Sequence, residues 1–161
     1  ALSSLQKFYP TAKALRDISV GQLKKHELAM SEDAFKRALH ITQENERVLE
    51  AIRLLADNDT EAFGELLFAS HLSSQENFEN SCPELDFLIE VARSSNLCLG
   101  SRLSGGGFGG ISLHLVQSDR AQDYCNYIQK TFKNHYGILP DSYICKSANG
   151  ASATILKEAL V

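Results

Sequence analysis

The stretch Gly100-Ser101-Arg102-Leu103-Ser104-Gly105-Gly106-Gly107-Phe108-Gly109-Gly110 decides how the rest of the chain is interpreted. Five of the protein's ten glycines fall between Gly105 and Gly110. Glycine adopts positive φ freely and has no Cβ to hold another group away from the backbone. The stretch therefore predicts a loop against whose main chain a ligand can lie directly.

The residues on either side of the loop decide what kind of loop it is. Gly105, Gly107 and Gly110 satisfy the pattern G-x-G-x-x-G, but a dinucleotide-binding loop must be followed by a helix, whereas Ile111–Val116 has the pattern of a strand. A Walker A loop needs Gly-Lys-Ser/Thr at its end, which is missing here. A simple tight hairpin usually needs one or two glycines. We expect a ligand-binding loop that joins antiparallel strands over 97–103 and 111–116.

The segment Arg102–Gly110 resembles the third motif of the GHMP family of small-molecule kinases, and its phenylalanine form is similar to the galactokinase branch of that family. Two positions differ from the common motif, with Ser104 in place of threonine and Ile111 in place of cysteine. The resemblance extends from about residue 14 to about residue 150. Four further segments are similar in order and spacing: Leu15-Arg16-Asp17-Ile18, Thr42–Val48, Ser70-His71 and Ser81–Asp86.

This resemblance implies an α+β fold, the ferredoxin-like GHMP kinase C-terminal domain, with an antiparallel sheet covered by helices and a helical N-terminal half. It implies a parent enzyme that uses ATP and Mg²⁺ to phosphorylate galactose or a related sugar. The residues expected to form the substrate and phosphate loop are Ser104, Gly105, Gly106, Gly107, Phe108, Gly109 and Gly110.

The chain has no P-x-x-x-G-L-S-S phosphate loop, and none of its acidic residues stands in a motif for a base or metal ligand. A kinase needs groups that hold the phosphates, and it needs a residue that orients the attacking hydroxyl and ligands for the metal ion. We therefore expect residues 1–161 to be a single domain, the C-terminal half of a longer kinase, with no catalytic residue or metal ligand of its own. An N-terminal domain would carry those parts, and the chain alone would be inactive.

A second hypothesis is a catalytically silent relative on the same scaffold, such as a sugar-sensing regulator or an interaction module. The glycine loop does not distinguish the two. Nor does it choose galactose over N-acetylgalactosamine, because the resemblance assigns most sugar contacts to the other half of the enzyme.

Composition excludes some classes of partner. The net charge of −4 provides no basic stripe for nucleic acid, and no apolar run reaches the 18 residues of a membrane span. The N-terminus lacks the features of a signal peptide, so we expect a cytoplasmic protein. Cys82, Cys98, Cys125 and Cys145 are scattered, which favours small buried hydrophobes over disulfides or zinc ligands.

The first half of the chain is expected to form helices. Ser19 is expected to cap a helix over 20–28, and Ser31 a longer helix that ends near Ala56. In that helix, Asn45 is expected to clamp a loop backbone, and His40 and Glu44, which lack a third ligand nearby, are expected to be packing or surface residues. An apolar stripe of the longer helix is expected to be buried: Phe35, Ala38, Leu39, Ile41, Val48, Leu49, Ile52, Leu55 and Ala56.

Breaks in the apolar periodicity and capping residues divide the rest of the chain into further helices. Residues 57–60 are expected to begin a helix that ends near Gln75, in which Gly64 would allow close helix packing. Ser81-Cys82-Pro83-Glu84 is expected to open the next helix as a capping box, and Ser118 to cap the last, which Gly137 ends. The expected inward residues are Leu85, Leu88, Ile89 and Ala92, and then Ala121, Tyr124, Cys125, Ile128 and Phe132.

Near the C-terminal end we expect a strand over 143–146, followed by a possible edge strand or loose tail over 151–156. Together these elements predict two β-α-β-like halves that share a small antiparallel sheet with helices on one face. Within the loop, we expect Phe108 to be buried as an anchor, against this domain in preference to the missing one. A Cβ at Gly107 or Gly109 is expected to obstruct the approach of another backbone.

Overall fold

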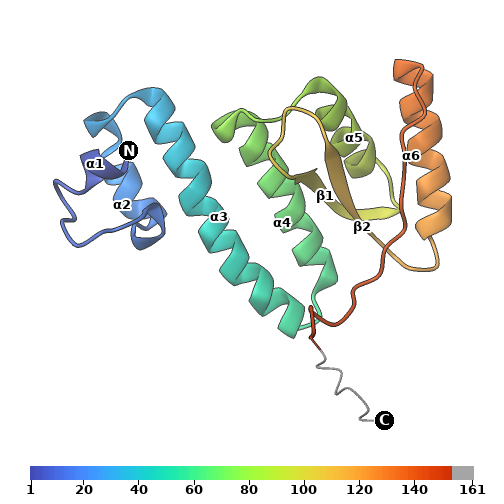
Figure 1. The fold of residues 1–161 in the computed structure, drawn as a ribbon, viewed down its shortest axis with the longest axis horizontal. Helices are drawn as coiled ribbons and strands as arrows, with labels where there is room; N and C mark the ends of the chain where they lie inside the picture. Colours follow the sequence, from blue (N-terminus) through green and yellow to red (C-terminus); the bar gives the residue numbers. More distant parts are fainter. Residues whose placement is uncertain (154–161) are drawn as a thin grey trace, which may run out of the picture.

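The computed structural model describes residues 1–153 (Figure 1). In chain order, the elements are α1 (Leu2–Leu5), η1 (Leu15–Asp17), α2 (Val20–Lys25), η2 (Glu27–Ala29), α3 (Glu32–Ala56), α4 (Thr60–Ser73), η3 (Ser74–Phe78), α5 (Pro83–Ser94), β1 (Cys98–Ser104), β2 (Ile111–Val116) and α6 (Ala121–Tyr136). Four short helical segments form the N-terminal lobe, and the helices α3, α4 and α5, with the π-helical turn η3 between the last two, lead from it to a hairpin of two strands.

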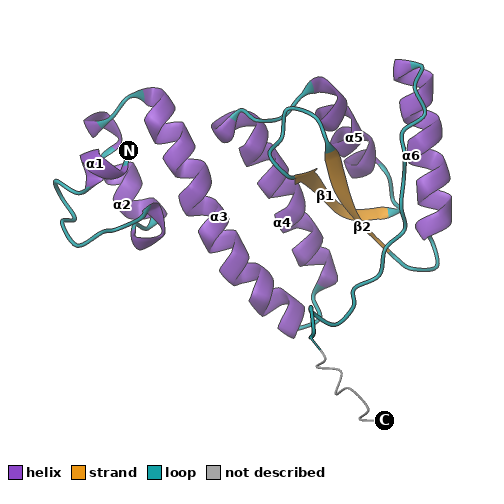
Figure 2. Ribbon diagram, viewed as in Figure 1, coloured by secondary structure: helices purple, strands orange, loops and turns teal. Residues whose placement is uncertain are grey.

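The predicted α+β fold and the antiparallel hairpin are confirmed. Strand β1 pairs with β2, with Arg102 opposite Leu113 and Ser104 opposite Ile111, so the glycine loop closes the hairpin. Helix α4 packs along β1, α5 packs against both strands, and α6 packs on α5 (Figure 2). The hairpin is thus held on several sides by helices, which fixes where the loop emerges.

The predicted strand over 143–146 is wrong. That segment has no regular structure, and Tyr143 is 84% exposed. A short apolar run becomes a strand only when it finds a pairing partner, and among residues 1–153 the sheet has two strands. Residues 151–153 have no regular structure, and the remainder of the predicted edge strand lies outside the described residues. The described part therefore has one hairpin in place of two β-α-β-like halves.

Three of the predicted helix caps are confirmed. The Ser19 hydroxyl accepts the N–H of Gln22 at 3.2 Å, and the Ser31 and Asp59 side chains accept backbone N–H groups in the same way. The first of these helices is shorter than expected. It ends at Lys25, where His26 turns to stack on Phe8 with ring centroids 3.8 Å apart.

Two predicted caps are wrong. Helix α5 begins at Pro83 after Cys82, without a side-chain cap, and the Ser81 hydroxyl donates to Asp86 instead. Helix α6 begins three residues after Ser118, again without a side-chain cap. At its other end Gly137 has φ 75°, the left-handed conformation that was predicted to stop the helix.

Only part of the apolar stripe on α3 is buried. Ala38 is 1% exposed in the N-terminal cluster, whereas the C-terminal half of the stripe faces outward. The N-terminal lobe contacts α3 near its start and α4 covers another face, so the described residues leave this side uncovered. The stripe residues that are more than half exposed are Val48, Leu49, Ile52 and Leu55.

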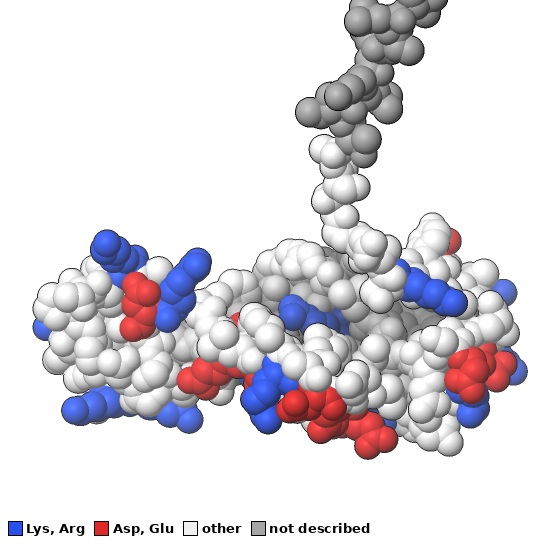
Figure 3. All heavy atoms as spheres, turned by 90° about the horizontal axis from the view of Figure 1, so that it is seen from below, with Lys and Arg blue, Asp and Glu red and all other residues white. Residues whose placement is uncertain are grey.

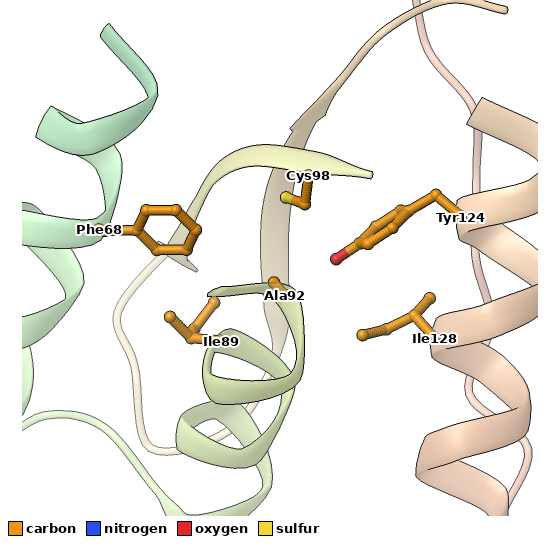
Figure 4. Packing of buried hydrophobic residues seen from close by; sticks show 6 residues of the cluster. All are labelled: Phe68, Ile89, Ala92, Cys98, Tyr124 and Ile128. Carbon is orange, nitrogen blue, oxygen red and sulfur yellow. The ribbon is translucent and has the colours of Figure 1, made fainter. Parts of the chain in front are cut away.

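The apolar core divides into two clusters. The first lies in the N-terminal lobe and contains Leu5, Ala12, Ile18, Leu23 and Ala38. The second joins α4, α5, β1 and α6 and contains Phe68, Ile89, Ala92, Cys98, Tyr124 and Ile128 (Figure 4). The hairpin that carries the glycine loop therefore rests on the second cluster.

Helix α4 approaches β1 closely where two glycines meet. A Cβ on Gly100 would lie 2.2 Å from the carbonyl oxygen of Gly64, and a Cβ on Gly64 would lie 2.1 Å from that of Leu99. The sequence predicted that Gly64 would permit close packing against a helix. The neighbour is instead the backbone of a strand.

Candidate ligand-binding loop

The loop Gly105–Gly110 has a backbone that only glycine adopts readily. Gly105, Gly107, Gly109 and Gly110 have φ values of 87°, 83°, 120° and 92°, and Phe108 has φ 58°. Left-handed backbone costs other residues about 1–2 kcal/mol each. The positive φ values therefore explain why so many glycines are needed in this loop. Gly105, Gly106 and Gly110 are exposed.

Asn80, which is 7% exposed, holds the loop. Its carbonyl oxygen accepts the N–H of Phe108 at 2.6 Å, and its Nδ2 donates to the carbonyl oxygen of Gly106 at 3.1 Å. A Cβ on Gly107 would lie 2.0 Å from the same Asn80 carbonyl oxygen. At Gly109 a Cβ would meet nothing within 4 Å, so there the φ of 120° is what requires glycine.

Phe108 is not the internal anchor that the sequence predicted. Its side chain is 77% exposed, and the residue is fixed by its backbone N–H on Asn80. The expectation failed because a hydrogen bond from the main chain orders the loop without any burial of the ring. The alternative, a contact with another domain, stays a prediction.

Asn45 does not clamp a loop backbone. Its Nδ2 is buried with no hydrogen-bond partner in the described structure. The clamp comes from Asn80, which the sequence analysis missed. The one signal in the sequence was an asparagine directly before Ser81-Cys82-Pro83, since asparagine is frequent in turns and tolerates hydrogen bonds to nearby backbone.

His71 supports the last residues of β1. Its Nδ1 accepts the N–H of Leu103 at 3.3 Å, so the ring proton is on Nε2, which lies 3.1 Å from Asp86 Oδ1. Burial lowers the pKa of His71, against the opposing effect of Asp86. Asp86 also accepts hydrogen bonds from Ser81 and Gln75. The segments Ser70-His71 and Ser81–Asp86, which are far apart in sequence, thus meet beneath the loop.

A second polar cluster joins α3, α4 and β1. Glu44 accepts a hydrogen bond from Ser70 at 2.8 Å and forms ion pairs with Arg47 and Arg102. Burial alone would raise the pKa of Glu44, but the hydrogen bonds from Arg47 and Ser70 and the nearby arginines outweigh it, and the pKa is lowered. The cluster fixes Arg102, two residues before Ser104.

The remaining candidate ligands take packing roles. His40 lies 3.0 Å from the Ser73 hydroxyl and against the ring of Phe78. Within residues 1–153, no three His, Cys, Asp or Glu side chains are grouped so as to hold a metal ion. The described residues therefore do not fit a Mg²⁺ site of their own.

Cysteine burial follows the sequence prediction in part. The four thiols are free, and Cys98 is buried in the second core cluster. Cys82 and Cys125 are half-buried. Cys145 is exposed, contrary to the prediction, because it lies in the segment that failed to form a strand.

The outer surface has mixed charge. On the face in Figure 3, acidic and basic side chains lie among one another and form no continuous basic stripe. No helix in residues 1–153 is long and apolar enough to cross a bilayer. The glycine loop stays the candidate ligand site that the sequence predicted. Successive peptide N–H groups in such conformations form concave sites for anions.

Comparisons with known proteins identify the class to which this fold and loop belong. Residues 48–134, more than half of the chain, match the family model described as GHMP kinases C terminal. The chain belongs to the GHMP kinase family. Its relatives within that family include galactokinases.

A galactokinase of Roseiflexus sp. (strain RS-1) is 35% identical over 150 residues, which are 93% of this chain and 38% of that protein. A galactokinase of Actinobacillus succinogenes is 39% identical over 142 residues, 86% of this chain and 37% of that protein. The crystal structure of Lactococcus lactis galactokinase complexed with galactose superposes with a TM-score of 0.78 and 29% identity, covering 84% of this chain and 35% of that one. The chain therefore spans somewhat more than a third of the length of these relatives.

Proposed function

We propose that this chain is the C-terminal part of an ATP-dependent sugar kinase that converts galactose and ATP to galactose 1-phosphate and ADP. The observation that carries the proposal is the exposed loop Gly105–Gly110 at the end of the hairpin. Its residues have mostly positive φ values, and Asn80 holds it by two hydrogen bonds. The support for the proposal is the match of residues 48–134 to the GHMP kinases C-terminal family model, together with the similarity of the chain to galactokinases.

The contribution of the chain to the reaction is positioning. Phosphoryl transfer is catalysed mainly by holding the reactants in line and by stabilising charge on the transferred group. Peptide N–H groups fixed before the substrate arrives stabilise such charge without rearrangement. Ser104 and the loop glycines would supply these donors on one wall of the cleft. In this proposal the proton acceptor and the Mg²⁺ ligands come from outside this chain.

The remaining parts belong to the proposed whole enzyme. An N-terminal domain would bring the phosphate loop, the base and the Mg²⁺ ligands, and would close against Ser104–Gly110. ATP and galactose, or a closely related sugar, would be the substrates in the cytoplasm. The exposed ring of Phe108 is available for contact with that domain.

A chimaera tests this proposal. This chain would replace the matching segment of Lactococcus lactis galactokinase, and galactose-dependent ADP formation would be measured beside the isolated 161-residue chain. We expect turnover by the chimaera and none by the chain alone. A matched G107V chimaera should lose activity at least about tenfold, because left-handed φ alone costs a Cβ-bearing residue about 1–2 kcal/mol and the side chain meets Asn80.

Two results would contradict the proposal. Turnover by the isolated chain would show that it is not dependent on another domain. A folded chimaera that binds galactose and ATP but transfers no phosphate would favour the silent, sugar-sensing relative.

A further inference from the structure

The chain changes its helical geometry directly before Asn80, the residue that contacts the glycine loop. Helix α4 passes into the π-helical turn η3, and the next residue, Glu79, has a left-handed φ of 58°. π-Helical turns cost hydrogen-bond quality and are often found at functional sites. The turn delivers Asn80 to the loop.

Two cations from α3 fix this turn. Glu79 forms ion pairs with Lys36 and Arg37, and Arg37 also donates to the carbonyl oxygen of Asn77 at 2.6 Å. These hydrogen bonds lower the pKa of Glu79 to about 2, so the carboxylate is charged throughout the neutral range. A left-handed glutamate is unfavourable by itself, and the contacts to α3 hold it there.

The orientation of the Asn80 amide is determined by its neighbours. Nδ2 faces the carbonyl oxygen of Gly106, and the reverse orientation would place two acceptors against each other. Its Oδ1 is buried and has no partner in the described structure. A buried acceptor without a partner is costly, and an apolar side chain of similar size would avoid that cost. What the amide adds in return is the contact with Gly106.

We propose that Asn80 is a positioning residue, which holds Gly106–Phe108 in the conformation that presents the loop peptides, and that the ion pairs of Glu79 hold Asn80 in place. The link to catalysis rests on the proposed kinase function. The structural part does not, and the two parts are tested separately.

The structural test uses the 161-residue chain and solvent-exchange NMR of the Phe108 amide. N80A keeps the carbonyl oxygen that accepts this amide but removes the side-chain bond to Gly106. We expect the Phe108 amide to exchange about fivefold to tenfold faster, the effect of losing one hydrogen bond. N77A is the matched control, because Asn77 lies in the same turn and its side chain bonds only Ser73 among the described residues. It should leave the exchange rate within about twofold.

A second variant distinguishes a specific hydrogen bond from loss of packing. In N80D the carboxylate faces the Gly106 carbonyl and repels it, but the protonated carboxyl can donate to it. Burial raises the pKa of a carboxyl above its usual 3.9 or so. The Phe108 exchange rate of N80D, divided by that of N80A at the same pH, should fall as the pH is lowered from about 7.5 to about 5. A ratio that does not change with pH would overturn the assigned hydrogen bond.

The catalytic test uses the chimaera. N80A should lower kcat about tenfold and change the KM values for ATP and galactose less than about twofold, because the loop acts on the transition state. N77A should retain the kcat of the parent chimaera. If N80A folds poorly, G107A is the second variant, because its Cβ would crowd the carbonyl oxygen and Nδ2 of Asn80 from the loop side, and it should also lower kcat.

The outcomes separate the two proposals. Faster Phe108 exchange in N80A with an inactive parent chimaera would support the positioning of the loop and contradict the kinase. An active chimaera in which N80A has the parent's exchange rate and kcat would overturn the role of Asn80 and leave the kinase intact.

Discussion

Phe108 illustrates how a single residue can be ordered without being buried. Its ring is 77% exposed while its N–H is held by Asn80. We therefore expect F108A to change the melting temperature of the 161-residue chain by less than about 2 °C, since an unburied ring contributes little to stability. Differential scanning calorimetry measures this, and a fall of several degrees would mean that the ring packs on this domain after all. In the chimaera, the same variant tests whether the ring contacts another domain.

A half-buried histidine, His114, makes stability depend on pH. His114 lies between the hydroxyls of Tyr124 and Ser112, each 2.7 Å away, and burial lowers its pKa from 6.5 to about 4. The unfolded chain therefore takes up a proton first as the pH falls, and stability is lost from about pH 6.5 down to about pH 4.

The size of this effect follows from the linkage. Between about pH 7.5 and 5, His114 should account for a loss on the order of 2 kcal/mol in the free energy of unfolding. Urea denaturation at several pH values measures it. H114Q removes the titration, so its stability should vary less with pH than that of the parent chain. An equally steep profile in H114Q would assign the effect to other groups, such as His40 and His71, whose pKa values are also lowered.

At the residue scale, the sequence predicted the loop but not what holds it. The glycines define their own backbone, so Gly105–Gly110 could be recognised directly. The partners of Asn45 and Asn80 depend on which segments meet in space. An amide that is buried among helices and one that reaches a loop look alike in a sequence.

At the scale of elements, the contact of α4 with β1 depends on a pair of glycines. G100A would place a Cβ 2.2 Å from the Gly64 carbonyl oxygen and 2.5 Å from its Cα, both of them backbone atoms. Such overpacking should cost about 3 kcal/mol in the free energy of unfolding. G106A is the control, because a Cβ there meets nothing within 4 Å and no positive φ is required. It should stay within about 0.5 kcal/mol of the parent. Equal stability of G100A and G106A in denaturant would contradict the close approach.

Helix and strand assignments differed in how far sequence could predict them. Helix α3 and its Ser31 cap were readable because a helix forms its hydrogen bonds within one segment. A strand needs a partner elsewhere in the chain, which the short apolar run of 143–146 does not reveal. The cap at Ser81 failed for a related reason, since Ser81 has a competing partner in Asp86.

At the scale of the whole molecule, the two core clusters should respond separately to mutation. Leu23 is fully buried in the N-terminal lobe, and L23A should cost that lobe about 2–5 kcal/mol. Hydrogen exchange should become faster in α2 and the beginning of α3, while amides of β1 keep their protection. I89A in the second cluster should expose β1 instead. If L23A accelerates exchange in both regions equally, the clusters unfold as one unit.

Much of the overall architecture was predictable because the local signals agree with one another. Caps, apolar periodicity and the glycine loop predicted the order of helices and the hairpin. The exposed half of the α3 stripe could not be foreseen, since periodicity identifies an apolar face but not what covers it. Leu49 and Ile52 have the apolar spacing of core residues, but they are exposed in the described structure.

The placement of α4 also limits how the sheet can grow. The outer edge of β1 is taken up by α4, through Gly64 beside Gly100 and through His71 on the N–H of Leu103. In residues 1–153, the hairpin therefore has one edge left for another strand, that of β2. Edge-to-edge pairing of two copies through the described hairpin would use the β2 edge of each copy. The β1 edges would stay covered by α4, so among residues 1–153 this hairpin offers no second edge from which a fibre could propagate.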